Sequence, residues 1–503
     1  MEILGKNYNN TNFGQHAING KKVMVEYSSP NTNKPLHLGH LRNNFLGWSV
    51  AEIFKASGYE VIKSCIVNDR GIHICKSMIA WQLFANGATP QSTNTKGDHF
   101  VGDYYVRFNN EYKAQIEKFK AEGLKQEEAE NEAPIMKATQ QMLLDWEAGK
   151  PDVMELWATM NNWVYAGFDT TYKNIGSDFD AIYYESNTYL LGKKIVAAGL
   201  QNNIFNKEDD NSVWIDLTAD GLDKKIVQRK DGTSVYITQD IGLAQQKYEE
   251  YTIDRSIYVI GDEQNYHMKV LKLIAEKLQL PNAENIYHLS YGLVELPTGK
   301  MKSREGTVVD ADDIVAEMEK VAQEKTEELG KVKDFTTEEL TSLYHTIGLG
   351  ALKFFLLRID PKRKMIFNPE ESIDLHGFTG LFIQFNHARI KSILRKSSIV
   401  SSGLSVVTDR SSVVFLPLEK ELIVALEQCP TIVKQACDEM NPSAIAIYVY
   451  NIAKTFRSFY TEHSIAKAET ANKKHLRLQL ASMTGNVIKS GMHLLGVTVP
   501  ERM

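Results

Sequence analysis

The chain has 503 residues, of which 43% are hydrophobic and 10% aromatic, and its formal net charge at pH 7 is −6. This length and composition can bury cores in two or three domains, and no repeat or low-complexity tract stands out. No apolar run approaches the roughly 18 residues of a membrane span, so we expect a soluble protein without a membrane partner.

The first residues, Met1–Tyr8, contain neither a basic region leading into an apolar core nor an Arg-rich amphipathic pattern. We therefore expect the protein in the cytoplasm. The four cysteines lack CxxC spacing, which argues against a zinc site or a disulfide framework. They are predicted to be buried thiols at Cys65, Cys75, Cys429 and Cys437.

Short apolar runs separated by helical stretches predict a parallel, doubly wound sheet. The predicted strands are 23–25, 60–62, 257–260 and 286–289. Ligands of such sheets bind at the carboxyl ends of the strands. Segments 28–40 and 261–267 emerge there, and we expect them to share one pocket.

The first of these segments ends in His37-Leu38-Gly39-His40, at the start of a helical pattern over 40–56. Imidazoles at a helix N-terminus, where backbone N–H groups already favour anions, can hydrogen-bond phosphate oxygens. Gly39 lacks a Cβ, so the backbone there can lie close to an adenine or a ribose. The alternative is that both histidines serve only as helix caps.

Between the predicted halves of the sheet lies a long insert at about 71–229, whose stretch 113–148 is charged and helical in pattern. Its ordinary role is a packing or acceptor-stem subdomain. Downstream, Gly299–Gly306 places Lys300, Lys302 and Arg304 on a loop bounded by glycines. Such a loop can clamp a triphosphate, although by itself it is more often a solvated, charged turn.

The rest of the chain is predicted to be almost all helical and to end in a helix bundle. Helical patterns cover 311–328, 338–357, 418–440, 442–463 and 474–495, with a Ser-rich connector at 392–416. From residue 381 to the end, fifteen Lys and Arg stand against nine Asp and Glu. This basic excess supports RNA binding without establishing it, since a solvated surface has the same composition.

Together these motifs resemble the class I aminoacyl-tRNA synthetases, with His37–His40 as the HIGH-type motif and Lys300–Arg304 as the KMSKS-type loop. More narrowly, the chain resembles the arginyl-tRNA synthetases from about Val23 to Met503. The segments that carry this narrower match are 25–40, 68–71, 232–240 and 384–389.

The resemblance implies an α/β fold: a Rossmann-like, doubly wound parallel sheet with an insertion, followed by an all-α anticodon-binding helix bundle. The domains would be a catalytic domain at 23–370, its insert at about 71–229, and the helical domain at 371–503. Residues 1–22 would be a remnant where the family usually carries a domain that contacts the tRNA elbow. That departure predicts weaker or altered affinity for tRNA.

The activity implied is that of a monomeric arginine–tRNA ligase. It would use ATP with Mg²⁺ as a substrate, activate L-arginine to arginyl adenylate with release of pyrophosphate, and transfer arginine to the terminal adenosine of tRNA(Arg). No tightly bound cofactor is expected. A buried carboxylate rejects neutral competitors of arginine, so no editing domain is expected either.

The resemblance also implies residue roles. Phosphate contacts and catalysis would fall to His37, His40, Lys34, Lys300, Lys302 and Arg304, and further ATP contacts to Leu38, Gly39 and Ser303. Arginine would be bound by Glu26, Asn31, Tyr236, Asp240 and Gln264, and tRNA by Phe385, Arg389, Tyr460 and Met503. Ser303 stands where the family-wide loop has a lysine, and Lys34 is expected to compensate.

Each arginine-binding role has a plainer alternative. Tyr236 and Asp240 are four apart, so on a helix they share one face and suit a cationic ligand, but Asp240 could instead cap a helix. Glu26 could pair with Lys22, and Asn31 could form an Asx turn. Phe385 could be a core residue.

Three other kinds of protein also fit: another class I synthetase, a different adenylyl-transferring enzyme, and a non-catalytic tRNA-binding relative. The second would not need the basic helical C-terminus. The third would keep the bundle but lose motif residues, whereas His37 and His40 are present.

Overall fold

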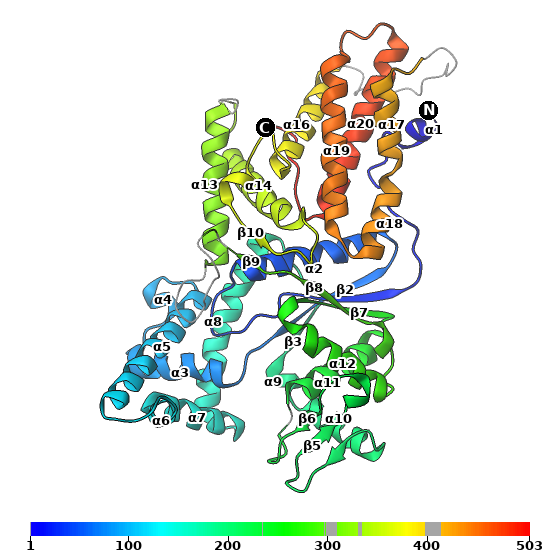
Figure 1. Ribbon diagram of the computed structural model, residues 1–503. Helices are drawn as coiled ribbons and strands as arrows, with labels where there is room; N and C mark the ends of the chain where they lie inside the picture. Colours follow the sequence, from blue (N-terminus) through cyan, green and yellow to red (C-terminus); the bar gives the residue numbers. More distant parts are fainter. Residues whose placement is uncertain (1, 234, 296, 298–308, 330–333, 398–413) are drawn as a thin grey trace.

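The computed structural model describes residues 2–233, 235–295, 297, 309–329, 334–397 and 414–503. The basic loop predicted at Lys300–Arg304 and most of the Ser-rich connector lie outside the described residues. The chain forms an α/β region, the catalytic region of the expected domain division, below a long helix bundle (Figure 1).

The centre of the molecule is a five-stranded, all-parallel sheet with the strand order β3-β2-β1-β7-β8. The strands are β1 (Lys22–Glu26), β2 (Glu60–Val67), β3 (Ala181–Tyr184), β7 (Arg255–Gly261) and β8 (Ile286–Tyr291). The four predicted strands are confirmed as β1, β2, β7 and β8. The edge strand β3 lies within the segment interpreted as an insert, so that segment supplies part of the main sheet.

Helices cover both faces of this sheet, as a doubly wound fold requires. Helix α2 (Leu38–Ala56) covers the face toward the bundle, and α11 (Tyr236–Tyr251) and α12 (Asn265–Lys277) lie on the other (Figure 1). The side chains of Val23 and Val25 on β1 are fully buried, and β1 packs against α2.

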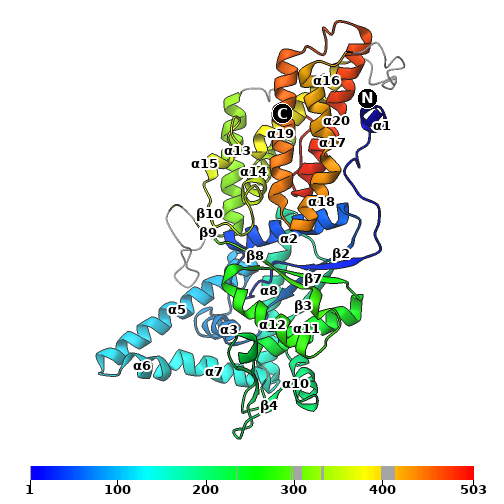
Figure 2. The ribbon, with the colours of Figure 1, turned by 45° about the vertical axis from the view of Figure 1, so that its right-hand side comes forward.

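The segment between β2 and β3 is a helical arm that extends away from the sheet (Figure 2). Its helices are α3 (Ile72–Phe84), α4 (Pro90–Thr93), α5 (Gly97–Ala121), α6 (Gln126–Glu132), α7 (Pro134–Glu147) and α8 (Pro151–Ile175). After β3 come α9 (Glu185–Thr188), α10 (Leu191–Gln201) and a small antiparallel sheet of β4 (Asn206–Lys207), β5 (Val213–Ile215) and β6 (Lys225–Gln228).

The C-terminal part is helical, as predicted. Its elements are α13 (Ala311–Leu329), α14 (Thr337–Leu357), α15 (Pro369–Ser372), α16 (Gly380–Lys396), α17 (Pro417–Glu427), α18 (Cys429–Glu439), α19 (Pro442–Glu462) and α20 (Ala471–Leu494). The two-residue strands β9 (Val294–Glu295) and β10 (Met365–Ile366) pair beside it. The helix expected over 418–440 is two helices, because the chain turns at Gln428, just before Pro430. The connector expected from Ser392 begins later, since α16 continues to Lys396.

The N-terminal residues pack on the bundle. Helix α1 (Glu2–Asn7) contacts α20, Asn486 donates from Nδ2 to the Tyr8 carbonyl at 3.1 Å, and the ring of His16 bonds the Pro430 carbonyl. The four cysteines are buried and free, as predicted.

Helix α14 comes closer to a membrane span than the sequence pattern predicted. Among the described residues it is long and apolar enough to cross a bilayer, but 61% of its most apolar window is buried. It packs against α13, α16 and α2. Such burial is typical of a core helix.

A buried lysine joins the catalytic region to the bundle. The Lys353 ammonium of α14 donates to the Gly496 carbonyl at 2.8 Å, just beyond α20, and lies beside Gly176 at the end of α8. Burial lowers the pKa of Lys353 to about 8. The ammonium thus lies at two helix C-termini, whose dipoles favour a cation.

Candidate active site and RNA-binding surface

His37 and His40 cap helix α2 reciprocally. His37 Nδ1 accepts from the Gly39 N–H at 3.1 Å, and His40 Nδ1 accepts from the His37 N–H, also at 3.1 Å. The two rings lie 4.0 Å apart. Both histidines therefore cap the start of α2, and the phosphate-binding role of their other ring nitrogens stays a prediction.

Capping also fixes the protonation of both rings. A ring nitrogen that accepts a backbone N–H carries no proton, so the neutral imidazole holds its proton on Nε2. Burial, with Lys34 nearby, lowers the pKa of His37 to about 3, and burial lowers the pKa of His40 as well. Near neutral pH each ring is an uncharged donor through Nε2.

The histidine motif lines a cavity of about 460 Å³ at the carboxyl ends of the parallel strands. The walls come from the end of β1 and the start of α2, from the end of β7, and from the segment after β8. They include Ser28, Ser29, His37, Gly39, His40, Asn43, Gly261, Glu263 and Tyr291. Segments 28–40 and 261–267 thus contribute to one pocket, as the strand order predicted.

Asn43 holds the two sides of this cavity together. Its side chain accepts from the Ser28 N–H and donates to the Val259 carbonyl at 2.7 Å and to the Tyr291 hydroxyl at 3.1 Å. Ser28 and Ser29 both have positive φ, 78° and 47°. Non-glycine residues in this strained region gather at functional sites, where other contacts hold them in place.

Gly39 is required by its neighbour. A Cβ there would lie 2.9 Å from Cε1 of His37, so the glycine makes room for the ring that caps the helix. Leu38 is fully buried in the core, and its N–H donates to the Val309 carbonyl. Lys34 is half-buried and close enough to affect the pKa of both histidines.

The segment that follows the basic loop is attached to the histidine motif. Asp310 forms an antiparallel bridge with His37, and the Ala311 N–H donates to the Leu36 carbonyl at 3.0 Å. Lys300, Lys302, Ser303 and Arg304 lie outside the described residues. The C-terminal end of their segment nevertheless returns directly to the His37 backbone.

Tyr236 and Asp240 lie on α11, as the four-residue spacing predicted. Tyr236 is 68% exposed and lines a second cavity of about 620 Å³, between α11 and the helical arm. The Asp240 carboxylate accepts a hydrogen bond from Nε2 of His267 at 2.7 Å. It lies in the second turn of the helix, so the alternative role as a cap is wrong.

Glu26 is buried at the end of β1 and pairs with the fully buried Lys247 of α11. The alternative that Glu26 pairs with a lysine is thus correct. The partner predicted for it, Lys22, is wrong, because Lys22 pairs with Glu60. Lys247 follows Asp240 by seven residues, or two helical turns, so both side chains lie on the same face of α11. This spacing is the pattern in the sequence that could have indicated Lys247 as the partner of Glu26.

Sequence reasoning missed Glu185, at the start of α9. It lines the cavity beside Tyr236, and Asp240 is close enough to affect its ionisation. Burial, with Asp69 and Asp240 nearby, raises the pKa of Glu185 to about 7. Its signal in the sequence was a carboxylate directly after the β3 strand. Asn31 and Gln264, the remaining residues of the arginine set, are exposed near the strand ends.

A basic cavity of about 870 Å³ opens in the helix bundle between α16, α19 and α20. Its cations are Arg389, Lys396, Arg457 and Lys474. The Arg389 guanidinium lies 4.9 Å from the Phe385 ring centre and 5.9 Å from that of Tyr460. Cations beside exposed aromatic rings suit single-stranded nucleic acid.

Met503, also expected to contact tRNA, and two further cations of α16 lie outside this cavity. Met503 is half-buried against the core and does not line the basic cavity. Lys391 and Arg395 are held by the C-terminal segment, at 3.2 Å from the Glu501 carboxylate and 2.9 Å from the Glu501 carbonyl. The half-buried Phe385 adjoins a helix face whose Ile390 is fully buried, so that face is partly core.

Comparison with known families agrees with this architecture. The family described as tRNA synthetases class I (R), catalytic domain, matches residues 3–368, and the DALR anticodon binding domain matches residues 383–503. A parallel sheet with a histidine-capped helix at its carboxyl edge, joined to a basic helix bundle, is the architecture of a class I aminoacyl-tRNA synthetase.

Similar proteins narrow the family. The arginine–tRNA ligase of Flavobacterium psychrophilum is 56% identical over 484 residues, 96% of this chain and 80% of the relative. That of Bacteroides fragilis is 50% identical over 505 residues, 100% of this chain and 84% of the relative. The chain belongs to the arginyl-tRNA synthetase family.

Solved structures support the fold. The arginyl-tRNA synthetase of Thermus thermophilus matches with a TM-score of 0.80 at 22% identity, over 100% of this chain and 86% of that one. A methionyl-tRNA synthetase of Mycobacterium tuberculosis, in complex with methionyl-adenylate, matches with a TM-score of 0.58 at 10% identity. It covers 96% of this chain and 92% of that one.

The low pKa of His37 predicts an acid-sensitive fold. Unfolded histidine takes up a proton below about pH 6.5, whereas folded His37 stays neutral down to about pH 3, so stability falls as the pH falls through this window. From pH 7 to pH 5 the loss from this one group is about 2 kcal/mol. His37→Asn keeps a capping side chain that does not titrate.

Urea unfolding at the two pH values measures this contribution. The stability of the His37→Asn variant should depend less on pH than that of the wild type, whereas His376→Asn, at an exposed position, should not change the dependence. Identical dependence in His37→Asn and the wild type would show that His37 titrates normally.

Proposed function

We propose that the protein is a monomeric, cytoplasmic arginine–tRNA ligase that activates L-arginine with ATP and transfers it to tRNA(Arg). The observation that carries this proposal is the pair of neutral Nε2–H donors in the cavity at the carboxyl edge of the sheet, together with Tyr236 and Asp240 on one face of α11. We assign residues 23–370 to catalysis and 371–503 to tRNA binding.

In the first step a carboxylate oxygen of arginine attacks the α-phosphorus of ATP. An oxygen–phosphorus bond forms, and the bond to the leaving pyrophosphate breaks. In the second step a ribose hydroxyl of the terminal tRNA adenosine, the 2′-hydroxyl in class I, attacks the activated carbonyl and AMP leaves. No side-chain nucleophile is needed, so catalysis consists of positioning and charge stabilisation.

His37 and His40 donate to phosphate oxygens through Nε2, and Lys34 adds a positive charge beside them. Gly39 and the Leu38 backbone shape the floor of the ATP site. Lys300, Lys302, Ser303 and Arg304 complete the contacts to the leaving pyrophosphate. This role is consistent with the return of their segment to His37.

Mg²⁺ enters as part of the ATP substrate. Of the described residues, Asp98, His99 and Asp312 place ligand atoms within 4.8 Å of one another, close enough for a metal ion. The Lys96 ammonium, however, lies 3.1 Å from the Asp98 carboxylate and 2.6 Å from that of Asp312. This cluster already has its cation and does not fit a metal.

The guanidinium of arginine is bound by the Asp240 carboxylate and the Tyr236 hydroxyl, with Glu185 as a second carboxylate. Binding a cation favours the ionised form of Glu185, whose pKa burial raises to about 7 in the empty pocket. Glu26 binds the α-amino group, with help from Asn31 and Gln264.

The bundle binds the anticodon arm. Phe385 and Tyr460 offer faces for bases, and Arg389 between them offers a positive charge. Met503 contributes from the C-terminal segment. The cations of the basic cavity suit the phosphate backbone, despite the net charge of −6 for the whole chain.

Pyrophosphate exchange into ATP tests the proposal. We expect exchange with arginine and with no other standard amino acid, and only when tRNA(Arg) is present. Exchange with another amino acid would indicate another class I synthetase. No exchange with any amino acid would indicate a non-catalytic tRNA-binding protein or a different adenylyltransferase.

The Asp240→Asn variant should raise the KM for arginine by roughly 10- to 100-fold, because a neutral amide replaces a charged partner of the guanidinium. The KM for ATP should change less than about twofold. Steady-state exchange at varied arginine and ATP measures both, with Asp216→Asn, on the exposed side of the small sheet, as the control. Equal effects on the two constants would contradict the assigned role.

The Lys34→Ala variant should lower kcat for exchange by roughly 100-fold or more, because its charge acts on the developing pyrophosphate. Lys34→Arg keeps the charge and should restore part of the rate. Lys21→Ala, which removes an exposed lysine before β1, is the matched control. Normal activation by Lys34→Ala would show that Lys34 does not compensate for Ser303.

A further inference from the structure

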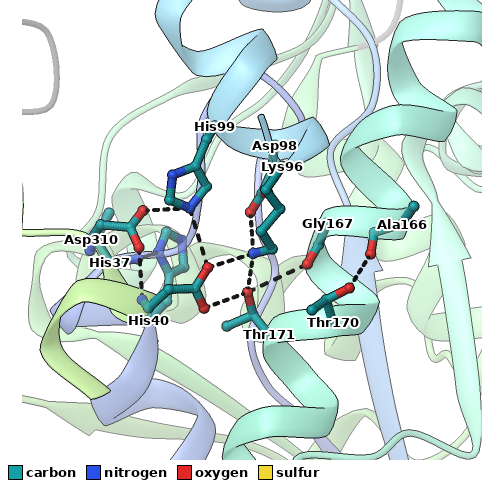
Figure 3. Close-up of polar contacts among 11 residues, drawn as sticks. His37, His40, Lys96, Asp98, His99, Ala166, Gly167, Thr170, Thr171 and Asp310 are labelled. Atoms are coloured by element: carbon teal, nitrogen blue, oxygen red, sulfur yellow. Dashed lines mark hydrogen bonds and ion pairs between the residues drawn. The ribbon is translucent and has the colours of Figure 1, made fainter. Parts of the chain in front are cut away.

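A single ammonium joins three helices beside the histidine motif (Figure 3). Lys96, the residue before α5, donates from Nζ to the Asp98 carboxylate at 3.1 Å, to the Thr171 hydroxyl of α8 at 2.5 Å and to the Asp312 carboxylate of α13 at 2.6 Å. An ammonium has three N–H donors, and all three are used. The side chain therefore has one satisfied orientation.

Asp312 is the centre of this arrangement. Besides Lys96, its carboxylate accepts from the Thr171 hydroxyl at 3.0 Å and contacts Nε2 of His99 at 3.2 Å. Its own N–H donates to the Asp310 carboxylate at 2.7 Å. The contacts with Lys96 and His99 hold the pKa of Asp312 down at about 2, although burial raises it. The carboxylate stays ionised and bound.

This cluster continues into the backbone of the histidine motif. Asp310 pairs with His37 as an antiparallel bridge, and hydrogen bonds join Ala311 to Leu36 and Leu38 to Val309. A movement of the start of α13 would therefore move the His37 backbone. Since His37 and His40 cap each other, it would move both imidazoles.

Helix α5 also reaches the motif from another side. A Cβ on Gly102 would lie 2.8 Å from the Pro35 ring and 3.6 Å from Cα of Lys34. The helix that carries Asp98 and His99 thus packs directly on the turn before His37. The motif is held between α5 and the segment 309–311, and the Lys96 cluster ties these two together.

We propose that Lys96 and Asp312 are positioning residues for adenylate formation, which hold His37 and His40 at the ATP phosphates through the bridge between Asp310 and His37. The inference rests on the proposed ligase activity. Neither side chain lines the cavity at the histidine motif. Their contribution is to the rate of the activation step rather than to the affinity for arginine.

Pyrophosphate exchange by the full-length protein with saturating tRNA(Arg), at varied arginine and ATP, tests this role. Lys96→Met and Asp312→Asn should each lower kcat by about tenfold or more, because a small displacement of catalytic groups costs up to roughly 100-fold. The KM for arginine should stay within about twofold. Lys96→Arg, which keeps a cation with several N–H donors, should restore part of kcat.

The double variant, with both substitutions, should be no slower than the slower single variant, because the two residues act as parts of one cluster. Lys173→Met removes an exposed ion pair with Asp169 from α8 and should leave kcat unchanged. Thr171→Val is a milder variant that keeps all charges, and its kcat should fall by about two- to fivefold. It keeps the test informative if a charge variant does not fold.

Normal kcat in the folded Lys96→Met and Thr171→Val variants would overturn the inference. A fall in kcat accompanied by an equal fold increase in the KM for arginine would also overturn it. In either case a wild type that exchanges arginine leaves the ligase proposal intact. A wild type that exchanges no arginine would overturn the ligase proposal, and this inference with it.

Discussion

The candidate active site depends on how helix α2 begins. The first N–H groups of a helix lack partners within it, and here imidazoles supply the acceptors. This choice fixes the tautomer of each ring, keeps both rings uncharged, and leaves the proton on Nε2 of each ring as a donor. It also requires Gly39, since the capping ring of His37 occupies the space of a Cβ. One capping interaction thus sets the geometry, the charge and the local sequence.

Around this helix start, buried charges are compensated before any substrate arrives. Glu26 has Lys247, and the carboxylates of Asp98 and Asp312 share Lys96. An unpaired buried charge is costly, so an empty site must be neutralised by its own side chains. In the proposed complex, the α-amino group of arginine would share Glu26 with Lys247. Glu185 is more open to a ligand cation because it lines a cavity, and Asp240 is partly exposed beside His267.

Much of the fold followed from patterns in the sequence. Apolar runs predicted β1, β2, β7 and β8, and the four-residue spacing placed Tyr236 and Asp240 on one helix. The edge strand β3 was missed because its Ala-Ile-Tyr-Tyr sequence is short and only partly buried. The break at Gln428 was missed because apolar spacing continues across it.

The site was harder to predict than the fold. The histidine motif could be recognised in the sequence because its residues are adjacent in the chain. Lys96, Thr171 and Asp312 could not be found in this way, because 75 and 216 residues separate the partners of the Lys96 ammonium. Glu185 belongs to the pocket only because β3 joins the sheet. Pairings over such distances depend on how the chain folds back and leave no local pattern.

Lys353 bears on how the α/β region and the helix bundle are held relative to each other. Its ammonium donates to the Gly496 carbonyl just beyond α20 and lies beside Gly176 at the end of α8. A Cβ on Gly176 would lie 3.4 Å from the ammonium and one on Gly496 3.3 Å, so both helix ends approach the lysine closely. A tRNA is a stiff molecule of fixed length, and an enzyme that contacts both of its ends needs a constant span. In the proposed ligase, the buried lysine helps to keep the distance between the catalytic region and the bundle constant.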